Sequence, residues 1–168
     1  KEYGYDDVQE AVMGAIGRNS TDTRALFFRL MGEDFPYDAV WERAREIAKN
    51  KIDTDGLPMM KGVKELLDYL KENDYRIGLA SSTRKGRILE QIESAGIADY
   101  FQVVVGGDMV KHSKPDPEIY LIACKELGVN PKDTYAIEDS LNGIRSAHGA
   151  GMKPLMVPDM IKPTPEIV

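Results

Sequence analysis

Apolar residues in the first third of the chain recur at intervals of three and four, which is the spacing of one face of an α-helix. Three stretches share this pattern, and turn-forming residues follow each of them: Val8 to Ile16, Leu26 to Met31 and Val40 to Ile47. The last of these turns, at 53–58, combines Asp, Gly and Pro. The pattern predicts three amphipathic helices, and we assign residues 1–57 to a helical domain.

From Gly62 onward, short apolar runs alternate with amphipathic segments. We expect the runs to be strands, at residues 76–80, 103–105, 135–137 and 155–157. The segments between them predict helices at about 61–73, 84–95, 116–128 and 141–149. Such alternation is typical of a parallel sheet with right-handed crossovers and helices on its faces. The sequence therefore predicts an α/β fold for residues 58–168.

Composition narrows the classes of function. The 168 residues are 42% hydrophobic and 30% charged, as in ordinary globular domains. With Cys124 as the single cysteine, no internal disulfide can form, and no apolar run is long enough to span a membrane. We therefore expect a cytoplasmic protein. The net charge of -6 disfavours nucleic acid as a partner, so an anionic substrate would need local cations or a metal ion.

Polar residues follow three of the predicted strands. Ser81 and Ser82 come after the first strand, Lys114 follows a few residues beyond the second, and Glu138 and Asp139 end the third. Ligands of open parallel sheets bind beyond the carboxyl ends of the strands. We therefore expect these hydroxyls, the ammonium group and the carboxylates to lie at one edge of the sheet.

The adjacent carboxylates indicate a metal site. Two ionised carboxylates about 4 Å apart repel each other by about 4 kcal/mol at an effective dielectric constant near 20, and a divalent cation would remove that cost. Mg²⁺ commonly binds one or two carboxylates and keeps water or phosphate oxygens in its other positions, which suits Glu138 and Asp139. Alternatively, Asp139 or Ser140 only caps the next helix.

Ser81 and Lys114 are candidates for holding a phosphate. Ser81 stands where a strand turns into a helix, so its hydroxyl and nearby backbone N–H groups could bind an anion. Alone, Ser81 would be read as an ordinary helix cap and Lys114 as a surface lysine. The order hydroxyl, Lys-Pro, Glu-Asp, with each member after a buried strand, is far more specific than any one member.

That order, together with the segments GLASST, HSKPDPEIY and IEDSLNGIRSAHGAG, resembles the haloacid dehalogenase superfamily, in particular its β-phosphoglucomutase-like phosphatases. The resemblance implies a Rossmann-like parallel-sheet core at 58–168 with an inserted α-helical cap domain at 1–57. It implies that Ser81 and Lys114 are catalytic, that both bind the phosphoryl group with Ser82, and that Glu138 and Asp139 hold Mg²⁺. The implied activity is hydrolysis of a small phosphate ester through an aspartyl-phosphate.

The sequence departs from the family in one respect. The family's nucleophile lies in an Asp-x-Asp motif that ends an apolar strand before the cap, and this sequence begins inside the cap. Asp53 and Asp55 spell a similar string, but the residues before them are polar, so we interpret this string as a hinge or turn. We expect the nucleophile to lie outside this sequence. The remaining strands should then leave a slot, open or filled, and should not close on one another.

The cap is expected to select the substrate. By the resemblance, Gly17, Arg18 and Asn19 occupy the specificity loop, and Arg18 either meets an anionic or sugar group or lies in solvent. Arg84 either contacts the distal part of the substrate or is a plain surface cation. β-Phosphoglucomutases carry an arginine three residues after the glycine, where this chain has Ser20, and this favours a phosphatase over a mutase.

Two readings from other classes remain. A receiver-type signalling domain also combines strand-end acids, a hydroxyl and a Lys-Pro, but it has its acids early and its Lys-Pro late, whereas here the order is reversed. A non-catalytic phosphate-binding relative would keep the fold without a nucleophile. For both hydrolysis and mutase transfer, we expect the partner to be a small-molecule phosphate ester. We expect the protein to be a monomer or a weak dimer.

Overall fold

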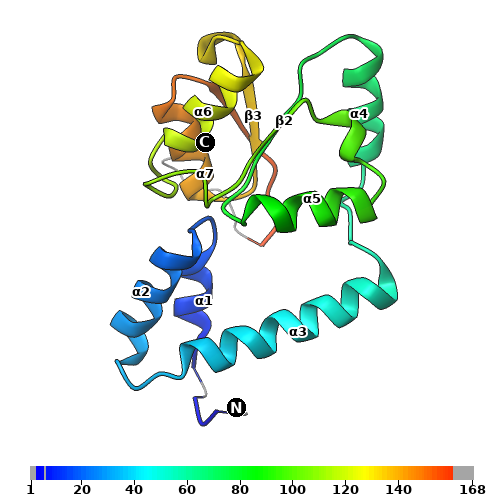
Figure 1. Cartoon of the computed structure of the whole chain (residues 1–168). Helices are drawn as coiled ribbons and strands as arrows, with labels where there is room; N and C mark the ends of the chain where they lie inside the picture. The colour runs from blue at the N-terminus through cyan, green and yellow to red at the C-terminus, as the bar shows by residue number, and fades with distance from the viewer. Residues whose placement is uncertain (1–2, 6, 161–168) are drawn as a thin grey trace.

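The computed structural model describes residues 3–5 and 7–160. Three helices come first, followed by an α/β region (Figure 1). In chain order the elements are α1 (Gln9–Ala15), α2 (Ser20–Met31), α3 (Tyr37–Asp55), α4 (Val63–Glu72), β1 (Gly78–Ala80), α5 (Lys85–Ser94), the 3-10 turn η1 (Ala98–Tyr100), β2 (Val103–Val105), α6 (Glu118–Leu127), the 3-10 turn η2 (Pro131–Asp133), β3 (Tyr135–Glu138), α7 (Leu141–Gly149) and β4 (Lys153–Met156). The predicted helices and strands are all present.

Helices α1 to α3 enclose an aromatic cluster of their own. Phe27 and Phe35 are buried, with ring centroids 5.4 Å apart, and Tyr37 packs on Phe27 at 5.5 Å. Asn19 caps α2 by accepting a hydrogen bond from the backbone N–H of Asp22 at 2.8 Å. The cluster gives this region its own core, which supports a separate helical unit, and the boundary at residue 57 stays a prediction.

The prediction of a hinge or turn at Asp53 and Asp55 is wrong in detail. Both residues lie in the last turn of α3, where Lys49 pairs with Asp53 at 2.6 Å and Lys51 with Asp55 at 2.7 Å. Ion pairs with this i,i+4 spacing favour a continued helix. The chain turns only at Gly56, whose φ is +79°.

The strands form two separate parallel pairs instead of the single expected sheet. β1 pairs with β2, with Gly78 opposite Val103, and β3 pairs with β4, with Tyr135 opposite Lys153. Within residues 3–5 and 7–160, no strand hydrogen-bonds to the other edge of β1 or of β3. The two pairs have not closed on one another. Closure would have contradicted the expectation of a slot, so the arrangement agrees with that expectation.

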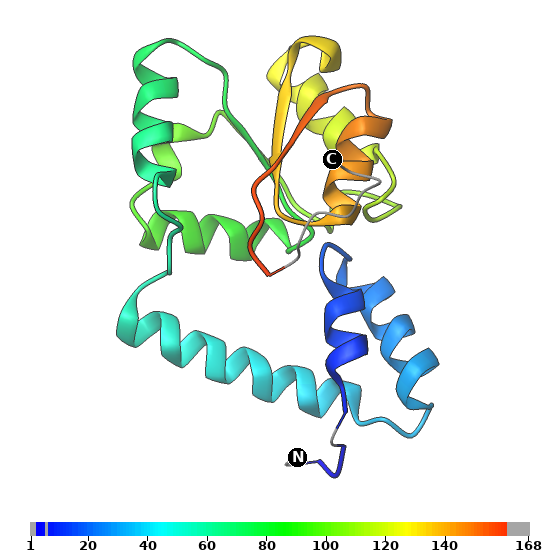
Figure 2. The ribbon, with the colours of Figure 1, turned by 180° about the vertical axis from the view of Figure 1, so that it is seen from behind.

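Helices cover the two pairs unequally, as the view from behind shows (Figure 2). One face of β1 and β2 packs on α6, and apolar residues of α4 and α5, including Leu67 and Ile88, cluster with Val104 of β2. For β3 and β4, α7 covers one face. The alternate side chains point the other way, so that Tyr135 is 61% exposed and Ile137 51%.

Strand β1 is shorter than predicted, and the two residues before it form hydrogen bonds that involve side chains. The Arg76 guanidinium donates to the carbonyl oxygens of Leu127 and Gly128 at 2.8 and 2.9 Å. The backbone N–H of Ile77 donates to the Gln102 side chain at 2.6 Å. The ladder begins at Gly78.

Among the described helices, none is both long enough and apolar enough to cross a bilayer.

Candidate functional site

Lys114 joins the carboxyl ends of the two strand pairs. It lies in the loop between β2 and α6, before a cis peptide bond to Pro115, and is only 5% exposed. Its Nζ forms an ion pair with the Glu138 carboxylate at the end of β3, and it lies 3.5 Å from the carbonyl oxygen of Ala80 at the end of β1. The ammonium group is therefore fixed where both sheets end.

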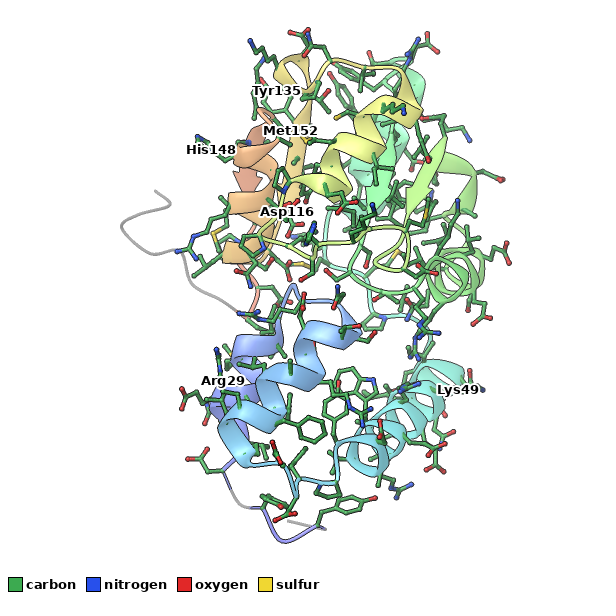
Figure 3. All side chains as sticks on the ribbon, turned by 60° about the vertical axis from the view of Figure 1, so that its left-hand side comes forward. Arg29, Lys49, Asp116, Tyr135, His148 and Met152 are labelled. Carbon is green, nitrogen blue, oxygen red and sulfur yellow. The ribbon has the colours of Figure 1, made fainter. Side chains whose placement is uncertain are left out.

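The side of the molecule that carries this site faces the helical cap. In Figure 3, Tyr135 at the start of β3 lies at the end of the molecule remote from α1 and α2, whereas Asp116 lies in the half nearer to them. Gly17 of the cap lies against Ser140, whose hydroxyl donates to the Glu138 carboxylate, so the end of β3 lies on the side of the cap. The site stands between core and cap.

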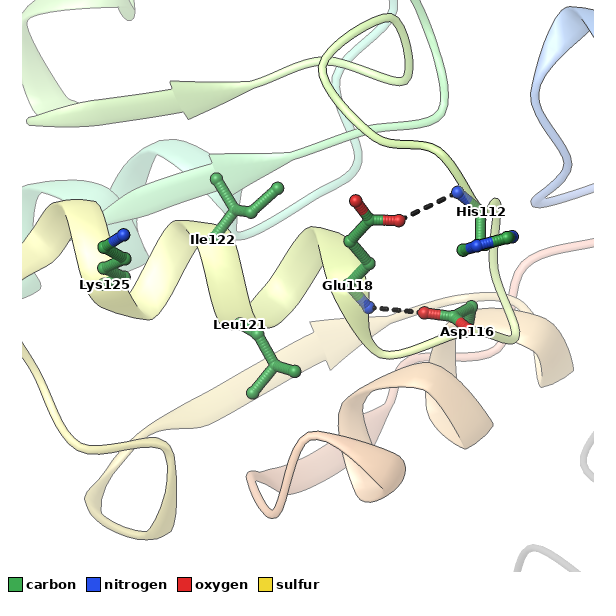
Figure 4. A pocket seen from close by; sticks show the side chains of 6 residues that line it. All are labelled: His112, Asp116, Glu118, Leu121, Ile122 and Lys125. Carbon is green, nitrogen blue, oxygen red and sulfur yellow. Dashed lines mark hydrogen bonds between the residues drawn. The ribbon is translucent and has the colours of Figure 1, made fainter.

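A hydrogen-bonded loop holds Lys114 in place. The carboxylate of Glu118 accepts hydrogen bonds from the backbone N–H groups of Lys111 and His112 at 3.0 and 2.8 Å. Asp116 accepts from the Glu118 backbone N–H at 2.9 Å (Figure 4). The two backbone bonds hold the pKa of Glu118 below its ordinary value. The loop that carries Lys114 is thus tied to the first turn of α6.

Glu138 is held at both of its oxygens. Oε1 accepts hydrogen bonds from Lys114 and from the Tyr120 hydroxyl, and Oε2 accepts one from Ser140 at 3.2 Å. Ser140 also caps α7 by accepting from the backbone N–H of Gly143 at 3.0 Å. Burial, followed by the negative charge of Glu138, raises the pKa of Tyr120 far above its ordinary value, so the phenol stays a donor.

The predicted metal ligands stand side by side at the end of β3. The side chain of Glu138 is 8% exposed, and Asp139 is exposed. In the described part of the chain, no group of three or more His, Cys, Asp and Glu residues could hold a metal ion. Mg²⁺ needs only one or two carboxylates when water and phosphate oxygens complete its shell. The pair has the number of carboxylates that part of a Mg²⁺ site requires, and its role as metal ligand stays a prediction.

The two serines after β1 have different partners. Ser81 follows Ala80 at the strand end, and its Oγ accepts a hydrogen bond from the backbone N–H of Thr83 at 3.2 Å. The Ser82 hydroxyl donates to the carbonyl oxygen of Gly17 in the cap at 2.8 Å. Ser81 thus lies at the same strand end as Ala80, which Lys114 approaches, whereas Ser82 contacts the cap. Arg84 is exposed and marks the start of α5.

The loop between α1 and α2 rests on this end of the core. A Cβ on Gly17 would lie 3.0 Å from Ser140 Oγ and 3.3 Å from Asn142 Cβ. The Asn142 side chain donates to the carbonyl oxygen of Ile16 at 3.2 Å. Asn19 is occupied in capping α2. The cap loop therefore contacts both strand ends through main-chain atoms.

Arg18 lines a groove beside the site. The groove has a volume of about 550 Å³ and is lined by Arg18, Asp22, Lys111, His112, Ser113, Lys114, Pro115 and Asp116. Arg18 donates to the carbonyl oxygen of Gly14 at 2.9 Å, and the Ser113 hydroxyl bonds Asp22. The groove thus runs between the cap loop and the loop that carries Lys114, and it contains more cations than acids.

A second groove, of about 380 Å³, lies at the start of α6 (Figure 4). None of Ser81, Lys114 and Glu138 lines it. Its walls include the apolar Leu121 and Ile122, and its Glu118 carboxylate already accepts two backbone hydrogen bonds. We therefore place the functional site at Lys114.

Sequence reasoning missed Tyr120 and Asn142. Tyr120 lies on the apolar side of α6 and is 6% exposed. A buried tyrosine usually finds a partner for its hydroxyl, and that rule could have identified it. Nothing in the sequence pattern distinguishes Asn142 from an ordinary polar residue in the first turn of a helix.

Comparisons with known proteins agree on one family. A family model described as haloacid dehalogenase-like hydrolase matches residues 1–157. The phosphorylated carbohydrates phosphatase of Thermotoga maritima is 37% identical over 105 residues, which are 62% of this chain and 49% of that protein. Hexitol phosphatase B of Escherichia coli is 32% identical over 101 residues, 60% of this chain and 46% of that protein. The chain thus spans about half the length of these curated relatives.

A solved structure gives the same result. The crystal structure of a CbbY variant from Rhodobacter sphaeroides, in complex with xylulose-(1,5)bisphosphate, superposes with a TM-score of 0.77 at 26% identity. The superposition covers 93% of this chain and 72% of that one. The described cap and core therefore share the arrangement of a solved relative.

Proposed function

The chain belongs to the haloacid dehalogenase-like hydrolase family, and we propose that it supplies the cap and most of the core of a Mg²⁺-dependent phosphatase. The substrate is a small phosphorylated metabolite, a sugar phosphate or a similar ester. The observation that carries the proposal is the burial of Lys114 at the meeting point of two strand ends, beside Glu138. A buried ammonium group at a ligand-binding edge suits a transferring phosphoryl group.

In this proposal the residues divide the work. Lys114 and Ser81 bind oxygens of the phosphoryl group. The chain has a net charge of -6 and would repel this anionic group, and the positive charge of Lys114 counteracts that repulsion at the site. Glu138 and Asp139 would hold Mg²⁺, which when bound supplies further charge neutralisation. An aspartate outside this sequence attacks the phosphorus, the P–O bond to the alcohol of the ester breaks and the alcohol leaves, and water then hydrolyses the aspartyl-phosphate to inorganic phosphate and the free aspartate. The slot between β1 and β3 suits a strand that carries this aspartate.

The contacts of the remaining predicted residues refine their roles. Ser82 holds the cap loop through Gly17, so its part in phosphate binding depends on the cap being open. Gly17 and Asn19 shape the loop, and Arg18 faces the groove beside Lys114, where a sugar or anionic group could lie. Arg84, exposed at the start of α5, stays a candidate for contact with the distal end of a substrate.

The first test uses the metal ligand least involved in packing. In the complete protein, Asp139→Asn should abolish Mg²⁺-dependent hydrolysis of p-nitrophenyl phosphate, because it removes one of the paired carboxylates. Asp99→Asn, an exposed position in η1, is the control and should retain full turnover. Unchanged turnover in Asp139→Asn would contradict the assignment.

A second test separates hydrolysis from mutase transfer. Ser20 stands where β-phosphoglucomutases carry an arginine, and this favours hydrolysis. With a panel of sugar phosphates and Mg²⁺, we expect release of inorganic phosphate and no isomeric sugar phosphate.

We also propose a cytoplasmic location and neither a nucleic-acid nor a membrane partner, given the acidic charge and the lack of a spanning helix among the described residues.

A further inference from the structure

Tyr120 reaches from α6 to the end of β3, and the proposed function gives it no role. Its side chain is buried, and its hydroxyl donates to Oε1 of Glu138. The same oxygen accepts the Lys114 ammonium group, which lies 3.4 Å from the Tyr120 hydroxyl and 4.9 Å from the centre of its ring. For packing alone, phenylalanine would serve equally well.

The hydroxyl matters because Glu138 is buried. A buried carboxylate that loses a donor is strongly destabilised or turns towards another partner. Lys114 has a second task in the proposed function, since it must bind a phosphoryl oxygen. If the ammonium group then turns away from Oε1 of Glu138, that oxygen keeps one donor from the described residues around it, the Tyr120 hydroxyl.

We propose that Tyr120 is a positioning residue that holds Glu138 in place for the metal, whether or not Lys114 is engaged with phosphate. This inference rests on the proposed function, because it assumes that Glu138 and Asp139 bind Mg²⁺. Tyr120 fixes one carboxylate oxygen and Ser140 holds the other at 3.2 Å, so rotation of the carboxylate is opposed from both sides. Residues that orient a metal ligand typically change metal affinity about 10- to 100-fold when replaced.

The test is Tyr120→Phe in the complete protein, with Tyr37→Phe as its matched control. Both tyrosines are 6% exposed. Tyr37 lies in the cap, and its hydroxyl has no hydrogen-bond partner among the described residues. Mg²⁺ binding is measured by titration calorimetry without substrate, and folding is checked by the urea midpoint. Tyr120→Phe should bind Mg²⁺ about 10-fold more weakly, whereas Tyr37→Phe should bind it like the wild type.

The outcomes separate this inference from the function on which it rests. Wild-type Mg²⁺ affinity in Tyr120→Phe overturns the role of Tyr120 and leaves the phosphatase proposal standing, provided that Asp139→Asn loses the metal. Wild-type affinity in Asp139→Asn overturns the metal assignment and the Tyr120 role together. If Tyr120→Phe fails to fold, Tyr120→Met replaces it, because methionine adapts to the apolar space without offering a donor. A loss shared by Tyr37→Phe also counts against the proposal.

Discussion

At the scale of single residues, Gly143 determines how closely α7 approaches the Glu138 carboxylate. A Cβ at Gly143 would overlap with Oε2 and the carboxylate carbon, and would lie 2.5 Å from Oε1. Glu138 could escape that contact only by leaving the buried ammonium group of Lys114 and the hydroxyl of Tyr120. Gly143 is therefore required by the carboxylate beside it, although glycine weakens a helix interior.

We predict that Gly143→Ala lowers the free energy of unfolding by about 1 to 3 kcal/mol, the usual cost of overpacking a buried site. Gly86→Ala in α5 is the control, because no atom lies within 4 Å of the added methyl group. There alanine should be neutral or stabilise by up to about 1 kcal/mol. Urea unfolding of both variants measures the difference, and equal stabilities would show that Glu138 can move without cost.

Single residues also show what sequence reasoning could reach. Ser81, Lys114 and Glu138 were predicted to converge because each stands at or after the carboxyl end of a strand. The structure brings Lys114 to Glu138 and to Ala80, the residue before Ser81, and the roles of these residues stay predictions. Tyr120 was missed because its partner is 18 positions away in sequence. Only the fold brings a helical tyrosine to a strand-end carboxylate.

The anchor of the Lys114 loop should depend on pH. The pKa of Glu118 is lower in the folded protein, so the stability this group contributes is complete above its unfolded pKa and disappears as the pH falls through the folded pKa. We predict that Glu118→Gln lowers the urea midpoint near neutral pH, and that the gap to the wild type narrows in acid. A gap independent of pH would mean that the charge of Glu118 does not hold the loop.

At the scale of elements, the turn between α1 and α2 fastens the cap to the core. The carbonyl oxygens of Ile16 and Gly17 accept hydrogen bonds from Asn142 and Ser82. A contact through main-chain oxygens leaves no signature in the sequence of the turn, so sequence analysis assigned this turn to substrate selection alone. The turn therefore also holds the cap against the core, through the carbonyl oxygens of Ile16 and Gly17.

We predict that Gly17→Ala weakens the contact between this turn and the core. Its φ of +81° and its closeness to Ser140 both oppose a side chain. Gly32→Ala is the control, since φ there is +94° but no atom lies within 4 Å, so both variants share the backbone strain of about 1 to 2 kcal/mol. Trypsin should cleave after Arg18 several-fold faster in Gly17→Ala only. Equal cleavage rates in the two variants would locate the effect in backbone strain.

Element boundaries depended on interactions that periodicity does not reveal. The helical pattern of α3 was recognised, but its end was predicted too early, because the two lysine–aspartate pairs in its last turns extend the helix to Asp55. The first strand was predicted too long because the backbone N–H of Ile77 bonds the Gln102 side chain instead of the neighbouring strand. In each case a side-chain contact decided where the regular backbone stopped.

At the scale of the whole molecule, the sheet remains in two halves. Alternating strands and helices predicted the layers correctly, but pattern alone does not tell whether neighbouring strands pair. Lys114 bridges the carboxyl ends of β1 and β3, although these strands share no hydrogen bonds. The site is therefore assembled by a side chain that spans the two pairs.

This division leaves an apolar face on β3 and β4 and on Val157 after it, which no helix or strand of the described residues covers. Tyr135 and Ile137 are more than half exposed, and Leu155 and Val157 are 48% and 43% exposed. Contiguous exposed apolar surface beside an unpaired strand edge promotes association. The net charge of -6 opposes association through repulsion between whole molecules. The four side chains of this face are themselves uncharged, so they add nothing to that repulsion.

We therefore predict that the 168-residue chain alone self-associates through this face and binds a hydrophobic dye. Ile137→Lys should shift the chain towards monomer in sedimentation velocity and reduce dye binding, because an ammonium group in the middle of the face must stay hydrated. Ile47→Lys in α3 is the control: Ile47 is 54% exposed, nearly the same as Ile137, but it lies outside the face. Equal association of the wild type and both variants would mean that this face does not drive self-association. If only Ile137→Lys becomes monomeric, the surface beside the open slot is the one the molecule has to cover.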